Sequence, residues 1–134
     1  MKLYLASLLQ KENFGPGRII GIINTNGGKP RDVKLDSVFE PFTPNIDSIA
    51  KYNKSRPTDA STAGQVFVFE YNQQLQKFLD ILRASAVADN REISELLPFQ
   101  DGDTLASWER AEFTNYRKVL APFLEQMGFE VILK

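Results

Sequence analysis

The sequence contains neither cysteine nor histidine. The absence of cysteine excludes disulfide bonds, thiolate metal ligands and cysteine nucleophiles. The absence of histidine removes the commonest general base and the commonest ligand of transition metals. We therefore expect no metal site and no cofactor.

Strong net charge and long apolar runs are also missing. Sixteen basic residues nearly balance seventeen acidic ones, giving a net charge of -1, so the composition gives no reason to expect nucleic acid or an anionic membrane as a partner. No segment approaches the roughly 18 to 20 continuous apolar residues of a membrane span. The segment from Met1 to Gln10 is better explained as a core strand than as a signal peptide. We therefore predict a cytoplasmic protein.

The composition is sufficient for one folded domain. The chain has 134 residues, of which 43% are hydrophobic. Both values are ordinary for a globular protein with a core of its own. We expect a single domain over residues 1–134.

Four short apolar segments are typical of buried β-strands. The clearest one contains four isoleucines, Ile19, Ile20, Ile22 and Ile23. Isoleucine is β-branched, and β-branched residues favour strands. A glycine- and proline-containing turn cluster precedes it at residues 12–17. The predicted strands span residues 2–9, 18–23, 104–108 and 130–133.

Two helices are predicted in the middle of the chain. Asn45 can cap a short helix through Asn53, whose inward residues would be Ile46, Ile49 and Tyr52 or Ala50. Thr62 and Gln65 fit a capping box at the start of a longer helix, which should end near Ala86. Its inward residues at helical spacing are Phe67, Tyr71, Leu75, Phe78, Leu79 and Leu82.

A last helix is predicted over about residues 115–127. Pro122 lies inside it and should kink it, and Gly128 is well placed as its C-terminal cap. Strands separated by helices indicate a parallel sheet. The sequence thus predicts an α/β fold: a single small domain with a mainly parallel sheet of about four strands flanked by helices.

Three segments near the C-terminus carry a family resemblance. They are Leu-Ala-Ser-Trp-Glu at residues 105–109, Asn-Tyr-Arg at 115–117 and Gly-Phe-Glu-Val at 128–131. The pattern resembles the domain-of-unknown-function family 488, small bacterial and archaeal α/β proteins. Its members have a strand ending in Cys-aromatic or Cys-Ala and then Glu, a Cys-His-Arg triplet and a closing Gly-x-Glu-Val strand. Residues 1–7 and 21–23 are similar to the first two strands of its shorter members.

The departures from the family pattern affect its most reactive positions. Ser107 stands at the first cysteine, Asn115 at the second and Tyr116 at the histidine, whereas Glu109 and Arg117 are retained. Thiol or imidazole chemistry therefore cannot be carried over. The resemblance implies a fold and the frame of a site, without an established reaction.

The junction between the third predicted strand and the last helix is the first candidate site. α/β proteins commonly bind ligands beyond the carboxyl ends of their strands. The first amides of a helix lack intrahelical partners and favour an anion, so residues from Thr114 through Asn115 to Arg117 would attract one. Arg117 can add a bidentate contact. Alternatively, Thr114 caps the helix and Arg117 forms a structural ion pair with Glu109.

Other residues of this junction have competing interpretations. Glu109 is a candidate general base if burial raises its pKa, although most glutamates are solvated. Ser107 has no histidine base and no nucleophile elbow around it, which favours a small packed residue. Trp108 can stack on a planar ligand or serve as a buried anchor. Tyr116 falls on the apolar stripe and is expected in the core.

A second candidate lies in the loop from Asn24 and Thr25 to Arg31. Its glycines permit close approach of the backbone to a ligand, but it lacks the phosphate-loop and dinucleotide signatures, and a plain connection is the simpler interpretation. In a parallel sheet this loop, Ser7 and the segment from Ser107 to Arg117 would share one edge. That convergence predicts a pocket.

The leading hypothesis is a domain that binds a compact anionic or nucleotide-like ligand at this edge without nucleophilic catalysis. One alternative is a protein-interaction module, for which the proline-flanked Phe42 and Phe99 would be exposed contacts unless they fold back onto the core. A second alternative is a carboxylate-dependent hydrolase or transferase using Glu109. Homodimerisation is plausible because symmetric dimers are common.

Overall fold

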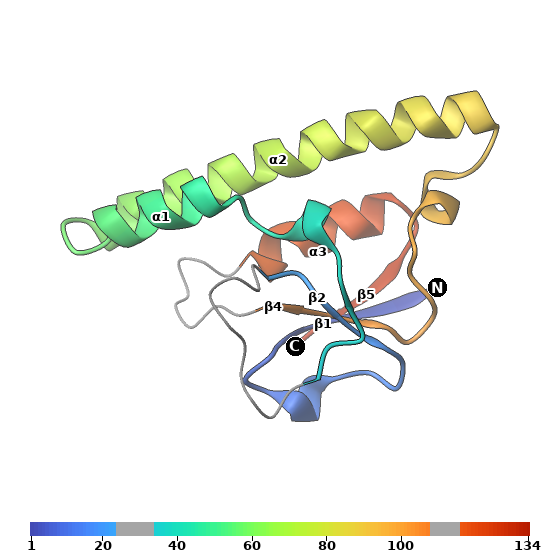
Figure 1. Cartoon of the computed structure of the whole chain (residues 1–134), viewed down its shortest axis with the longest axis horizontal. Coiled ribbons are helices and arrows are strands. Elements are labelled where there is room, and N and C mark those ends of the chain that lie inside the picture. Colours follow the sequence, from blue (N-terminus) through green and yellow to red (C-terminus); the bar gives the residue numbers. More distant parts are fainter. Residues whose placement is uncertain (24–33, 108–115) are drawn as a thin grey trace.

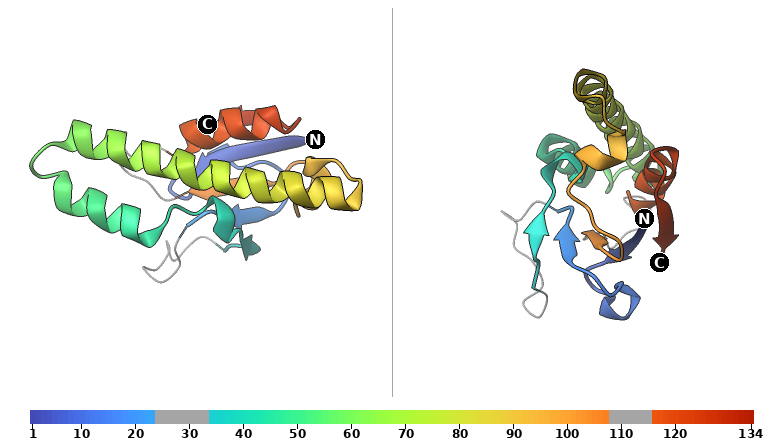
Figure 2. Two further views of the ribbon diagram at one scale, coloured as in Figure 1. Left: turned by 90° about the horizontal axis from the view of Figure 1, so that it is seen from above. Right: turned by 90° about the vertical axis from the view of Figure 1, so that its right-hand side faces the viewer.

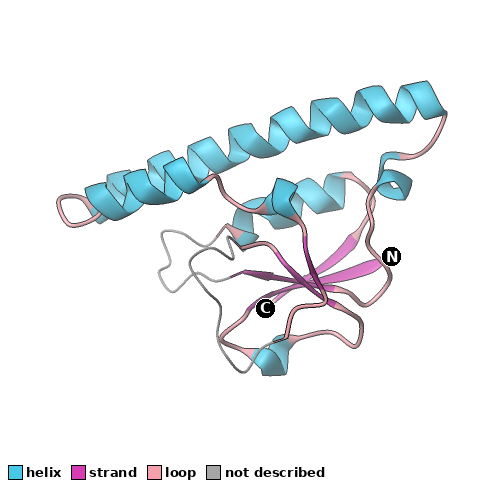
Figure 3. Cartoon of the chain, in the orientation of Figure 1, coloured by secondary structure: helices cyan, strands magenta, loops and turns pink. Residues whose placement is uncertain are grey.

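The centre of the fold is a parallel β-sheet. The computed structural model describes residues 1–23, 34–107 and 116–134, and its strands lie together beneath the helices (Figure 3). In this part of the chain the sheet has five strands in the order β3-β2-β4-β1-β5. The strands are β1 (Lys2–Ser7), β2 (Ile19–Gly21), β3 (Ser37–Val38), β4 (Thr104–Ser107) and β5 (Glu130–Leu133). Each neighbouring pair is parallel, so the predicted α/β fold is confirmed. The strand that was not expected is the two-residue edge strand β3.

The three α-helices lie on one face of the sheet (Figures 1 and 2). They are α1 (Ile46–Ser55), α2 (Ala60–Asp89) and α3 (Arg117–Gln126). The short 3-10 helices are η1 (Lys11–Asn13), η3 (Glu40–Phe42) and η4 (Ile93–Leu96), of which η1 lies on the opposite face. No helix in the described ranges is both long enough and apolar enough to cross a bilayer.

The main core fills the space between the sheet and these helices. Leu3, Leu5 and Leu105 are fully buried and face α2 and α3, because alternate residues of a strand point to the same face. The predicted inward residues of α2 are buried, except that Phe78 is half-buried. A smaller cluster on the other face contains Leu8, Ile23 and Ala106.

The beginning of α2 differs from the prediction. The helix is capped by Asp59, whose carboxylate accepts hydrogen bonds from the Thr62 amide at 3.1 Å and from its hydroxyl at 2.7 Å. The expected capping box of Thr62 with Gln65 is therefore wrong. Asp59 has the extended backbone that an N-cap requires, whereas Thr62 already lies within the helix. At the other end α2 continues to Asp89, three residues past Ala86.

The predicted inward face of α1 is only partly correct. Tyr52 is buried and Ile49 packs against the core, whereas Ala50 is exposed and 59% of Ile46 is accessible. Asn45 occupies the N-cap position, but its side chain makes no capping hydrogen bond. Helical spacing alone did not distinguish Ile49 and Tyr52, which pack against the core, from Ile46, which lines a groove beside α2.

The end of α3 follows the prediction. Gly128 has a φ of +96°, its amide donates to the carbonyl of Glu125, and the Phe129 amide donates to the carbonyl of Leu124. This is a Schellman motif, which favours glycine at the residue after the cap. Pro122 lies inside the helix as expected.

A buried carboxylate organises the amino edge of the sheet. Asp103 is 1% exposed and accepts four hydrogen bonds, from the amides of Arg18 (3.0 Å) and Gln100 (2.8 Å) and from Nε (3.3 Å) and Nη2 (2.7 Å) of Arg18. Burial tends to raise the pKa of this carboxyl group, but the hydrogen bonds and the guanidinium charge outweigh it and lower the pKa. Asp103 thus joins the beginnings of β2 and β4.

Candidate functional site

The candidate site lies where β1 and β4 end side by side. Ser7 is the last residue of β1, Ser107 is the last residue of β4, and the two are paired in register. Ser7 shares its face with Leu5 and Ser107 shares its face with Leu105, so both point to the helix-covered side. The two serines therefore meet at the carboxyl edge, where α/β sheets commonly bind ligands.

The hydroxyl groups of these serines are not fully used by the fold. Ser7 is 4% exposed and Ser107 is inaccessible to solvent. The Ser7 Oγ accepts a hydrogen bond from the Leu9 amide at 3.2 Å, which leaves its hydroxyl hydrogen available to donate. Within the described residues, the Ser107 Oγ has no hydrogen-bond partner. Leaving a buried hydroxyl without a hydrogen bond lowers the stability of the folded state by about 1–3 kcal/mol. A ligand that places an acceptor beside this hydroxyl would therefore gain binding energy.

Arg117 approaches the same edge from the beginning of α3. Its side chain is nearly buried, and Nη1 donates to the backbone carbonyl of Lys134 at 2.8 Å. The amide of Lys134 in turn donates to the carbonyl of Leu5, two residues before Ser7. The guanidinium group therefore lies close to the ends of β1 and β5 and connects them to α3.

The structure places three of the predicted ligand-binding residues, Ser7, Ser107 and Arg117, at this one edge. Tyr116, next to them, belongs to the core as expected, and its hydroxyl donates to the carbonyl of Ile22 at 2.8 Å. The other predicted site residues lie outside the described residues: Asn24, Thr25, Trp108, Glu109, Thr114 and Asn115.

The chemistry of this edge is that of hydrogen-bond donation. Two serine hydroxyls can donate hydrogen bonds, and a guanidinium group adds positive charge, so the edge favours negative charge. The described ranges contain no group of three or more carboxylates that could hold a metal ion. The arrangement is thus able to bind an anion, but it supplies Ser107 with no described general base.

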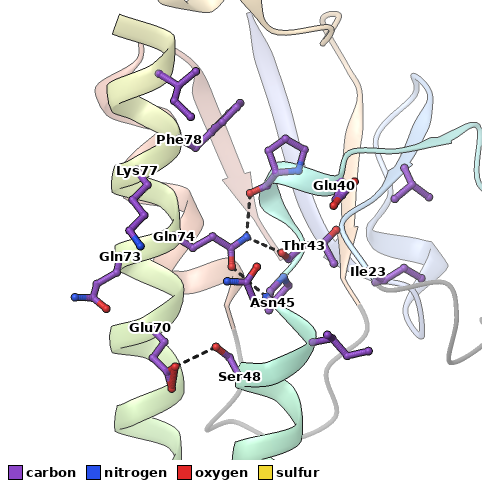
Figure 4. Close-up of a pocket in the computed structure, with 15 residues that line it drawn as sticks. Ile23, Glu40, Thr43, Asn45, Ser48, Glu70, Gln73, Gln74, Lys77 and Phe78 are labelled. Atoms are coloured by element: carbon purple, nitrogen blue, oxygen red, sulfur yellow. Dashed lines mark hydrogen bonds between the residues drawn. The ribbon is translucent and has the colours of Figure 1, made fainter. Parts of the chain in front are cut away.

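A groove lies elsewhere in the described part of the chain, between α2 and the segment from η3 to the beginning of α1 (Figure 4). It has a volume of about 880 Å³. Val38, Ile46 and Ile81 line it and are 44–63% exposed. The sequence did not lead us to predict this groove. Ile81 was the one indication of it, because it is a large apolar residue that falls outside the apolar stripe of α2.

Much of the polar lining of the groove is used by the fold itself. The Gln74 side chain donates to the carbonyls of Thr43 (2.7 Å) and Pro41 (3.2 Å) and accepts from the Asn45 amide (3.1 Å) (Figure 4). Glu70 accepts from the Ser48 hydroxyl and forms an ion pair with Lys51 at 3.1 Å. These contacts attach η3 and α1 to α2. The polar residues of the groove are therefore explained by their role in the fold and do not by themselves indicate a ligand.

Comparisons with known proteins identified no relative of this chain. No protein-family model, no curated protein and no solved structure matches the chain significantly.

Proposed function

We propose that the protein binds a compact anionic or nucleotide-like ligand at the carboxyl edge of β1 and β4, without nucleophilic catalysis. The observation that carries the proposal is the buried Ser107 hydroxyl without a partner among the described residues. Ser7 lies beside it and Arg117 approaches from α3. A ligand oxygen accepting from Ser107 would remove the cost of the unpaired hydroxyl.

Ser107→Ala is the variant that tests this proposal. The substitution removes a hydroxyl for which the described residues provide no partner, so the ligand-free variant should be at least as stable as the wild type. Thermal unfolding would be measured against a library of metabolites and nucleotides. We expect an anionic compound to raise the melting temperature of the wild type and to leave Ser107→Ala nearly unchanged. If no anion stabilises the wild type, or if the variant responds equally, the proposed site is wrong.

The alternative functions receive less support. The interaction hypothesis required exposed aromatic rings at Phe42 and Phe99, but these are 0% and 5% exposed and pack against each other and Phe39. Of the two interpretations of these rings, the structure shows that both fold back onto the core, so they do not provide the exposed contacts that the interaction hypothesis uses. The hydrolase hypothesis rests on Glu109, which lies outside the described residues.

The proposal also covers the family to which the chain belongs, its cellular location and its oligomeric state. The chain would be a divergent member of the domain-of-unknown-function family 488 that binds a small molecule in the cytoplasm as a homodimer. The five-stranded order β3-β2-β4-β1-β5 provides the test of relationship, since a family member with the Cys-His-Arg triplet should have the same order. A different order in such a member would exclude the relationship.

A further inference from the structure

We infer that the solvent-facing side of α2 is the surface through which two copies of this chain pair, with their α2 helices antiparallel. The inference rests on the homodimer of the proposed function and names its interface. It follows from where α2 lies, from the spacing of its exposed residues and from the charges among them.

The position of α2 leaves one side of it to solvent. Residues such as Phe67 and Leu75 pack in the main core, and α2 lies farthest from the sheet among the three α-helices (Figures 1 and 2). No helix or strand of the described ranges covers the side that faces away from the sheet. Val66, Phe69 and Val87 lie on that side and are 37%, 62% and 83% exposed.

The exposed residues of this side form one symmetric stripe. Its members are Val66, Phe69, Gln73, Gln76, Lys77, Asp80, Ala84 and Val87. Their intervals along the chain are three, four, three, one, three, four and three residues, which read the same from either end. Three turns of α-helix contain about 11 residues, so the two halves of the stripe, related by a shift of 11 residues, lie on the same side. The stripe therefore matches a copy of itself that runs in the opposite direction, as a two-fold interface requires.

The apolar ends of the stripe fit each other in this arrangement. Residues whose numbers add to 153 lie opposite one another, because the middle of the stripe falls between positions 76 and 77. Val66 then packs on Val87 of the second copy, and the large Phe69 packs on the small Ala84. Two-fold symmetry makes each contact twice, once at each end.

The polar middle of the stripe is complementary as well. The Gln73 amide lies opposite the carboxylate of Asp80 and can donate to it, and the Gln76 amide oxygen lies opposite the ammonium group of Lys77 and can accept from it. A parallel pair in register would instead set Lys77 against Lys77 and Asp80 against Asp80, which is repulsive. The charges therefore select the antiparallel pair.

Substitutions at position 73 should change the dimer dissociation constant in opposite directions, as measured by sedimentation equilibrium of the full chain. Gln73→Lys sets a positive charge opposite Asp80 twice in each dimer and should lower the constant by about fivefold. Gln73→Glu sets like charges together and should raise it by a similar factor. Within one helix the signs are reversed, because Lys77 lies four residues after position 73, so an effect on folding alone cannot imitate this result.

Phe69→Ser removes the largest apolar contact and should weaken the dimer about tenfold. Ile81→Ser is the matched control. Ile81 lies on the same helix and is 63% exposed, but it points about 90° around the helix from the middle of the stripe. This control should leave the dissociation constant nearly unchanged.

Single cysteines report the orientation of the two helices, because the chain contains no cysteine of its own. Val66 and Val87 lie opposite each other in the antiparallel pair, whereas the two copies of Val66 are about 32 Å apart along the helix. Oxidation of a mixture of Val66→Cys and Val87→Cys should therefore give the mixed disulfide dimer. Neither variant alone should cross-link efficiently.

A dimer with these signs at position 73 and this pattern of cross-links would support the inference. A dimer that Phe69→Ser and both Gln73 variants leave unchanged, or that cross-links each cysteine variant to itself, would overturn it and leave the homodimer in place. A chain that stays monomeric up to millimolar concentration would overturn both. Anion binding at Ser107 is measured separately, so the anion site and the dimer interface can fail independently.

Discussion

Replacing the buried carboxylate at the amino edge should cause a large and pH-dependent loss of stability. Asp103→Asn keeps the size of the side chain but removes the charge and sets an amide N–H₂ against the donors of Arg18 and Gln100. Removal of one partner from a buried ion pair costs about 3–5 kcal/mol. The Arg18 side chain is 40% exposed and can regain water, so we expect the lower end, about 3 kcal/mol. The melting temperature should fall by about 10 °C.

The pH dependence follows from the lowered pKa of Asp103. Above the ordinary carboxyl pKa of 3.8 the group is ionised in both states, and its stabilisation is fully present. Stability is lost as the pH falls through the lower pKa of the folded state, because the unfolded chain then binds the proton more readily. Asp103→Asn has no such group, so the difference between the two proteins should be constant from pH 7 to 5 and shrink below pH 4.

The assay is urea unfolding followed by circular dichroism at pH 7, 5 and 3. Asp101→Asn is the matched control, since Asp101 is exposed in the same turn and accepts one hydrogen bond from the Lys2 amide. It should lose about 1 kcal/mol or less. A loss below 1 kcal/mol in Asp103→Asn, or a difference from the wild type that does not change with pH, would refute the role assigned to the carboxylate.

Three further substitutions test the packing. Phe42→Ala should lose about 3–5 kcal/mol in urea unfolding, since it empties a fully buried ring position; a loss below 1 kcal/mol would contradict its place in the core. Gly15→Ala should cost about 1–3 kcal/mol, because the new methyl would lie 2.3 Å from the Tyr4 ring and 2.7 Å from the Gly102 carbonyl; an unchanged urea midpoint would contradict this close approach. Gly128→Ala should lower stability by about 1 kcal/mol through its positive φ alone, as no atom lies within 4 Å of the new methyl; Gly128→Asn should lose less, and equal losses would point to another cause.

Periodic segments were predicted well because burial itself produces their pattern. The stripe from Phe67 to Leu82 identified the face of α2 that packs on the sheet, and the sequence from Glu130 to Leu133 matches β5 at both ends. The proline-flanked Phe42 carries no periodicity. Whether such a ring points to solvent or to the core depends on partners distant in sequence, here Phe78 and Phe99.

The contacts that organise both edges of the sheet depend on strand order. Arg18 and Asp103 are 85 residues apart, and Ser7 and Ser107 meet only because β4 inserts between β2 and β1. A sequence that predicts parallel strands predicts that their ends share an edge, which is why Ser7 and Arg117 were considered together. It does not predict which strands are neighbours or which hydroxyl lacks a partner.

The proposed function requires an anion to bind at the carboxyl edge of β1 and β4. The most direct measurement is a titration of ¹⁵N-labelled protein with inorganic phosphate, followed through the backbone amide resonances. We expect saturable shifts for Ser7, Leu8, Ser107 and Arg117 in the wild type and their loss in Ser107→Ala. Shifts confined to the groove from Gln73 to Ile81, or no saturable shift at all, would contradict it.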